Sequence, residues 1–261
     1  MENLTYWEKQ TSPLYKDLEW NFPEKKTGKI NLVGGNSFGF STEIKIAEFL
    51  SSRYPVEELR LVFPDALQKK LPPLPNLFFA PSTSSGSFKK SLELNSEFEK
   101  ADFNLLLGDF SKNSETSVAI LEAIKSAPSV PTLLARDSVD LISADAETIL
   151  DRENLTIFAS LVQLQKLFRS VFYPKMILLS SPLVPVLESL HKFTLTYPVS
   201  ILTFHEQKII TARNGKIITT DLEKTEYSPL SLWDGRLAGK TAAFSLYNPN
   251  KPLESINAAL F

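Results

Sequence analysis

Residues 28–42 constrain the fold of this chain more than any other stretch of its sequence. Residues 30–33 form a short apolar run, which is typical of a strand buried on both faces. Gly34-Gly35 ends this run, and Ser41-Thr42 can cap a helix that follows. A buried strand, a glycine turn and a capped helix are how many α/β domains begin. The turn is a potential anion site, although a pair of glycines is also found in ordinary turns.

Apolar runs of strand length recur along the chain and alternate with helical patterns. The runs predicted to be strands are 59–63, 77–80, 103–107, 131–135 and 156–158, and further apolar runs lie at 176–179 and 199–204. Apolar residues at helical spacing predict helices over 114–127, over 161–171 and from Trp233 to about Tyr247. Asn214-Gly215 lies between two β-branched segments and predicts a hairpin.

Strands that alternate with helices indicate a mostly parallel sheet covered on both faces. We therefore predict a three-layer α/β/α sandwich in a single domain, residues 1–261, with residues 1–27 as a lead-in segment. We expect the strand at 30–33 to be central in this sheet. Gly34-Gly35 should then line a cleft at its carboxyl end together with Asp137, because open parallel sheets bind ligands at that edge.

The composition excludes several classes of function. The chain has no cysteine and two histidines, which removes disulfides, thiolate chemistry and histidine-rich metal sites, so we predict no metal site in the protein itself. Magnesium held by carboxylates stays open. The net charge of −2 gives no basic footprint for nucleic acid. We expect no signal peptide and no membrane partner, and hence a cytoplasmic protein.

Four landmarks, in order, resemble one known family. They are Lys26-Thr27-Gly28-Lys29 with Gly34-Gly35-Asn36-Ser37, then Leu105-Leu106-Leu107-Gly108, then residues 131–137, and finally the hairpin followed by Leu237-Ala238-Gly239. Together they resemble the ADP/ATP-dependent NAD(P)H-hydrate dehydratase family, which has a ribokinase-like fold. The resemblance implies nucleotide-driven dehydration of hydrated NADH or NADPH, with ADP or ATP and Mg²⁺ as cofactors. It implies a small-molecule nucleotide ligand as partner and leaves a homo-oligomer open.

The family's chemical groups are mostly replaced in this chain. Gly235 stands where the family has a catalytic aspartate, and Ala135-Arg136-Asp137 stands for its Asp-Ala-Asp. Residues 158–163 lack the proline, histidine and glutamate of its Thr-Pro-His-x-Gly-Glu. A positioned acid or base contributes about 10²–10⁴-fold to a rate, so we expect weak or lost activity. The alternatives are a non-catalytic homologue that binds a ligand or serves in an assembly, and a small-molecule kinase of the same fold.

The resemblance and the residue types assign roles at two places. The candidate substrate contacts are Gly34, Gly35 and Asn36 at the first glycine turn, and Asp137 just after the predicted strand 131–135. Asn36 can instead bond its own turn, and Asp137 can be a solvated loop acid. Before the last long helix, the candidate nucleotide contacts are Trp233, Gly235 and Arg236. Trp233 can stack on a base or pack as an ordinary aromatic.

Asp234 is the weak candidate for the catalytic base, displaced by one residue from the family's position. It can also act as the N-cap of the helix that we expect to begin there. Its carboxylate would then cover the first helical N–H groups, where the resemblance implies a nucleotide phosphate. On this interpretation the helix end is closed, and ADP and ATP bind poorly.

Overall fold

The computed structural model describes residues 5–12 and 20–261. Its strands form one ten-stranded sheet in the order β1-β10-β9-β8-β7-β6-β5-β2-β3-β4. Seven neighbouring strands are mutually parallel, and these are β2 (Thr27–Val33), β3 (Val56–Pro64), β4 (Leu77–Ala80), β5 (Phe103–Leu106), β6 (Thr132–Ala135), β7 (Leu155–Phe158) and β8 (Ser200–His205). The predicted strand at 30–33 is part of β2, between β3 and β5. It lies in the interior of the sheet, third from the β4 edge, and not at its centre as we expected.

The sheet continues past β8 through the predicted hairpin. Of the described strands, only β9 (Lys208–Arg213) runs against the others, and β10 (Lys216–Asp221) turns back beside it. Asn214 and Gly215 both have positive φ, 47° and 75°, as this tight turn requires. A short strand from the lead-in segment, β1 (Trp7–Gln10), pairs in parallel with β10 and forms the edge of the sheet. The sequence patterns did not predict β1.

Helices cover both faces of this sheet. One face carries α2 (Leu92–Glu99), α3 (Ser114–Ser126), α4 (Ser138–Leu141), α5 (Ala146–Leu150), α6 (Leu161–Ser170) and α7 (Leu183–Thr196). The other face carries α1 (Ser41–Arg53), α8 (Ser231–Asp234), α9 (Arg236–Tyr247) and α10 (Pro252–Ala258). Within the described residues, three 3-10 turns connect the elements, and they are η2 (Asp65–Leu67), η3 (Ile142–Asp145) and η4 (Leu222–Lys224).

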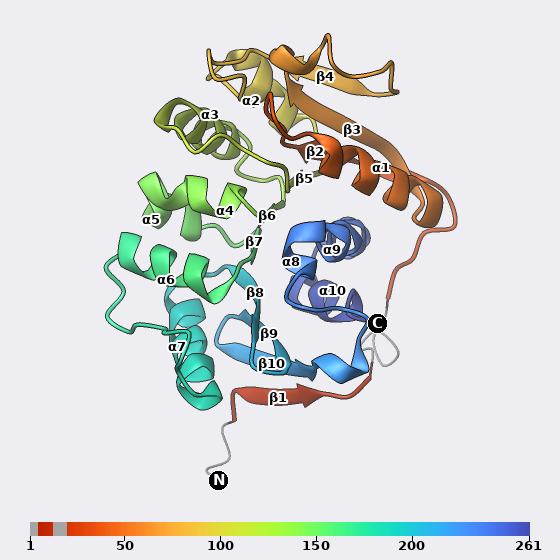
Figure 1. Cartoon of the computed structure of the whole chain (residues 1–261). Helices are drawn as coiled ribbons and strands as arrows, with labels where there is room; N and C mark the ends of the chain where they lie inside the picture. The colour runs from red at the N-terminus through yellow and green to blue at the C-terminus, as the bar shows by residue number, and fades with distance from the viewer. Residues whose placement is uncertain (1–4, 13–19) are drawn as a thin grey trace.

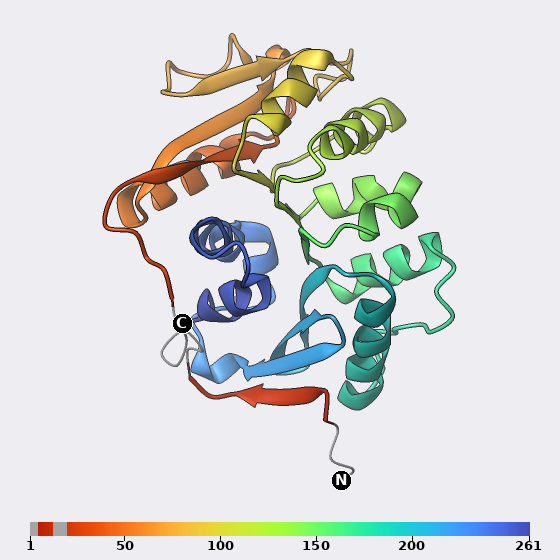
Figure 2. The ribbon, with the colours of Figure 1, turned by 180° about the vertical axis from the view of Figure 1, so that it is seen from behind.

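The sheet curves around the helices α9 and α10, which lie on its concave side (Figures 1 and 2). Two buried apolar clusters, one on each side of the sheet, hold the three layers together. The fold is therefore the predicted α/β/α sandwich with a mostly parallel sheet. None of the helices in the described ranges combines the length and apolar character needed to cross a membrane.

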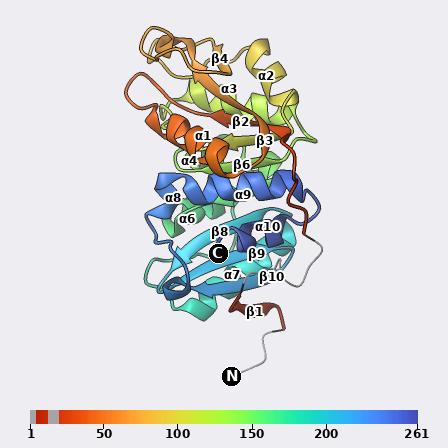
Figure 3. The same cartoon turned by 90° about the vertical axis from the view of Figure 1, so that its right-hand side faces the viewer.

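Helices α1 and α9 pack against each other on the concave side (Figure 3). Gly239 of α9 makes this close approach possible, because a Cβ there would lie 3.0 Å from Cγ2 of Ile46. Gly235 has a φ of 82° and lies against Ile46 and Leu107. The start of α9 is thus held next to α1 and to the carboxyl end of β5.

Candidate functional site

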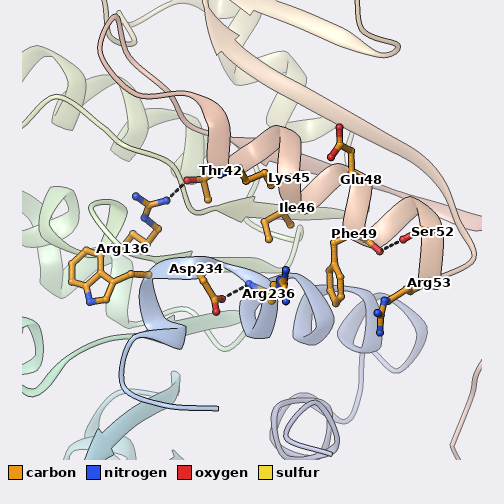
Figure 4. A pocket seen from close by; sticks show the side chains of 11 residues that line it. Thr42, Lys45, Ile46, Glu48, Phe49, Ser52, Arg53, Arg136, Asp234 and Arg236 are labelled. Atoms are coloured by element: carbon orange, nitrogen blue, oxygen red, sulfur yellow. Dashed lines mark hydrogen bonds between the residues drawn. The ribbon is translucent and has the colours of Figure 1, made fainter. Parts of the chain in front are cut away.

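A groove with a volume of about 740 Å³ runs between α1 and the α8–α9 segment (Figure 4). Four cationic side chains and two acidic ones line it: Lys45, Arg53, Arg136 and Arg236, with Glu48 and Asp234. Its other lining residues are Thr42, Ile46, Phe49, Ser52 and Trp233. The volume is within the range of small-molecule sites, and the balance of charge favours an anion.

The α8–α9 turn brings three of the predicted site residues to this groove. Trp233 is 43% exposed there, and Asp234 and Arg236 line the same wall. Gly235 lies between them and is buried by the packing against α1. The predicted nucleotide contacts are therefore adjacent in space as well as in sequence.

The start of the last long helix differs from our prediction. The helix α9 begins at Arg236, not at Asp234, and Gly235 in the left-handed region is its N-cap residue. The backbone breaks there because a residue with φ of 82° cannot continue α8 into α9. Asp234 still caps the helix from outside, since its Oδ1 accepts a hydrogen bond from the backbone N–H of Arg236 at 2.8 Å.

Arg136 lies toward one end of the groove, and the sequence patterns did not mark it as a site residue. It follows β6 with a φ of 59°, a conformation that is rare outside glycine. Its Nη2 lies 2.6 Å from Oδ1 of Asp109, and its Nη1 donates to the hydroxyl of Thr42. The side-chain amide of Gln163 donates to the backbone carbonyl of Arg136 at 2.8 Å. Three different elements thus hold this residue.

Glu43 fills the place where we expected a ligand to approach the first glycine turn. Its side chain is fully buried between Gly34 and Gly108, and a Cβ on either glycine would overlap its carboxyl group. Neither carboxylate oxygen has a hydrogen-bond partner within the described ranges. Burial raises the pKa of Glu43 to about 7, with a smaller contribution from Asp109. Glu43, which sequence reasoning also missed, is thus a buried acid with a pKa raised close to neutral pH.

The remaining candidates from the first turn are committed to local structure. Asn36 donates to the backbone carbonyl of Asp109 at 3.0 Å and accepts from the N–H of Phe38 at 2.8 Å. Asp137 follows β6 at the same edge of the sheet, but it pairs with Lys112 at 3.5 Å and does not line the groove. Gly34 and Gly35 are buried and also lie outside the groove lining. A cleft that these glycines share with Asp137, at the same edge of the sheet, stays a prediction.

A metal site formed by the protein alone is not found in the part of the chain that the structure describes. No group of three or more histidine, cysteine, aspartate or glutamate side chains there could hold an ion. Mg²⁺ that arrives with phosphate oxygens needs only one or two carboxylates from the protein, and Asp234 and Glu48 both line the groove.

Comparison with known proteins gives a fold. No protein-family model and no curated protein matches the sequence. Solved structures do match. A ribokinase-like superfamily protein from Enterococcus faecalis V583 is 13% identical over 99% of this chain and 87% of that chain, with a TM-score of 0.68. Bacillus subtilis YxkO, of the UPF0031 family, is 12% identical over 92% of this chain and 82% of that chain, with a TM-score of 0.59.

A third structure has a nucleotide analogue bound. Pyridoxal kinase from Staphylococcus aureus, in complex with AMP-PCP and pyridoxal, is 11% identical over 90% of this chain and 85% of that chain, with a TM-score of 0.52. Identities this low establish the shared fold alone. The chain has the ribokinase-like α/β fold, on which kinases bind nucleotides.

Proposed function

We propose that this protein binds a phosphate-bearing small molecule of the nucleotide type in the groove between α1 and α8–α9, with little or no catalysis. One observation carries the proposal. The groove places four cationic side chains against two acidic ones and adds an exposed indole, that of Trp233. Cationic side chains attract phosphate, and an exposed aromatic ring offers a face on which a base can stack.

The cationic groups are spread along the groove. Arg136 lies toward one end, Arg53 toward the other, and Arg236 between them (Figure 4). A ligand with one compact charge would use one of these groups, whereas a phosphorylated nucleotide reaches several. This extended arrangement supports a nucleotide-sized ligand over a single small anion.

The same geometry supports binding without turnover. Gly235, at the position of the family's aspartate, has no side chain that could take a proton. Asp234 has a carboxylate nearby, but its Oδ1 already accepts from Arg236. That hydrogen bond engages one of the two carboxylate oxygens, and Asp234 stands one position before the family's aspartate. The dehydratase activity implied by the resemblance and the kinase activity of structural neighbours both need that base.

Calorimetric titration with ADP, ATP, AMP, NADH and NADPH, with and without Mg²⁺, tests the binding. We expect Arg236→Gln to weaken binding about three- to tenfold, since an exposed charge contributes modestly. Arg169→Gln is the matched control, because Arg169 is exposed in the last turn of α6 and does not line the groove. Absence of binding by every compound, or equal loss in both variants, would contradict the proposal.

A turnover assay tests the second half of the proposal. Hydrated NADH is incubated with purified protein, Mg²⁺ and ADP or ATP, and the recovery of NADH is followed by absorbance. We expect no recovery above the uncatalysed rate. Rates within about tenfold of an intact family member would show that the protein is a working dehydratase, and a phosphorylated product that accumulates would indicate a kinase.

A further inference from the structure

The guanidinium group of Arg136 is only partly used by the protein. It makes one hydrogen bond to Thr42 and one to Oδ1 of Asp109. Its Nε is buried and has no partner within the described ranges. Arginine normally meets an oxyanion with two parallel N–H groups, so the contact with Asp109 leaves part of this capacity free.

The Asp109 carboxylate is bound to the guanidinium by a single contact. Its side chain is 38% exposed, and it contacts the guanidinium through one oxygen only. Water and salt reach the Asp109 side of this ion pair and partly screen it, whereas the Arg136 side chain is only 13% exposed. An incoming oxyanion could therefore take the place of the Asp109 carboxylate without disturbing the core.

Arg136 itself is held firmly. Its backbone conformation is fixed by Gln163, whose amide nitrogen donates to the Arg136 carbonyl and whose amide oxygen accepts from the N–H of Ser160 at 3.1 Å. Residues kept in rare backbone regions persist only where their surroundings over-determine them, and they cluster at functional sites. The hydrogen bonds to Thr42 and Asp109 orient the guanidinium above this fixed backbone, and Arg136 lines the groove.

We propose that Arg136 and Thr42 form an oxyanion subsite at one end of the groove, and that Asp109 occupies it as an internal stand-in until a ligand anion displaces it. The shared chemistry is an oxyanion that can accept two N–H bonds, either a phosphate or a carboxylate group. The subsite deepens the proposed function, on which it rests, by naming the residue that anchors the ligand's charged end.

The variant Asp109→Asn distinguishes a ligand-binding role of Arg136 from a purely structural one. If Asp109 competes with the ligand, Asp109→Asn should raise the affinity for ADP about three- to tenfold. If the Arg136–Asp109 pair is only structural, this variant should leave the affinity unchanged or lower it. Asp145→Asn is the matched control, since it removes an aspartate that pairs with Lys125 away from the groove.

Arg136→Lys is the second variant in this binding experiment. Lysine keeps the charge but lacks the two-donor fork, so ADP affinity should fall about tenfold or more. Circular dichroism and the unfolding midpoint of each variant show whether it is folded. Because the Asp109→Asn arm expects a gain of affinity, a fold defect cannot imitate it.

Titration with inorganic phosphate and with succinate distinguishes the two oxyanion sources. Tighter binding of phosphate by Asp109→Asn assigns the subsite to phosphate, and tighter binding of succinate alone assigns it to a carboxylate. The subsite is rejected if neither Asp109→Asn nor Arg136→Lys changes the affinity for any of these anions. If ADP binds and responds to Arg236→Gln but not to these two variants, the proposed function stands and the subsite fails. If the anions respond and no nucleotide binds, the subsite stands and the proposed function fails.

Discussion

The carboxyl group of Glu43 occupies the space that the absent Cβ of Gly34 leaves at the end of β2. Gly108, at the end of β5, faces it from the other side. The two glycines allow close approach, and the group that approaches belongs to the protein. This first turn is therefore a packed part of the core, and the groove lies next to it.

Replacing Glu43 with glutamine should change how stability depends on pH. Burial raises the pKa of Glu43 from its ordinary 4.5 to about 7 in the fold. The unfolded chain then releases this proton at lower pH than the folded chain does. The contribution is fully present below about pH 4.5 and is lost as pH rises to about 7, on the order of 3 kcal/mol.

Urea unfolding of wild type and Glu43→Gln between pH 4 and 8 measures this contribution. The difference in unfolding free energy between the two proteins should shift in favour of Glu43→Gln as pH rises. Glu99→Gln, at an exposed position of α2, should show no such trend. A constant difference across the range would mean that Glu43 is charged in the fold.

Gly108→Ala should destabilise the protein by about 1–3 kcal/mol or more, because the new methyl group overlaps both a side chain and backbone. Its Cβ would meet the Glu43 carboxyl and then Cα of Gly34 at 2.5 Å. Gly239→Ala is the comparison, since only the side chains of Ile46 and Leu50 face it and they can move. Thermal unfolding of both variants checks this, and equal losses would contradict it.

Asp234→Gly should improve nucleotide affinity several-fold. The Asp234 carboxylate accepts a hydrogen bond from the backbone N–H of Arg236, and its negative charge repels an incoming phosphate. The cost in stability should be only a few tenths of a kcal/mol, because Gly235 already serves as the N-cap residue. Calorimetry with ADP decides the matter. Tight binding by the wild type that Asp234→Gly weakens would reject the capping argument.

The affinity for ADP should fall as salt is added. Arg236 is exposed at the groove, so dissolved salt screens its attraction for phosphate. The distance over which charges attract falls from about 10 Å at 0.1 M salt to about 3 Å at 1 M. We expect a several-fold loss of affinity between 0.05 and 0.5 M NaCl, roughly the range where the Debye length halves or more. Adenosine, which lacks phosphate, is the control. A salt-independent ADP affinity would indicate that the groove's charges do not contact the phosphates.

The sequence predicted the layers better than the site, for physical reasons. Buried parallel strands are apolar throughout, so the strand at 30–33 and those at 103–107 and 131–135 were visible as runs. Asn214-Gly215 specified its turn locally. These signals depend only on neighbouring residues.

The site depends on contacts between distant residues. Glu43 is in the first turn of α1, where an acid is ordinarily exposed and interacts favourably with the helix dipole. Only the fold shows that its carboxyl group lies between Gly34 and Gly108. Arg136 meets Asp109 from another loop, and no local pattern reports that pair. The start of α9 was misplaced because a carboxylate just before a helix can cap it from more than one position.

The parallel pairing of β1 with β10 has a consequence for solubility. A sheet edge presents unpaired backbone N–H and C=O groups that can recruit a strand from another molecule. Here a four-residue strand covers that edge, and its Glu8 and Lys9 are exposed. Tyr6 fixes it further by stacking on His191 with 3.9 Å between the ring centroids. With β1 in place, the backbone groups on that side of β10 are paired, and the outermost strand is short and carries exposed charges, features that disfavour pairing with a strand of another molecule.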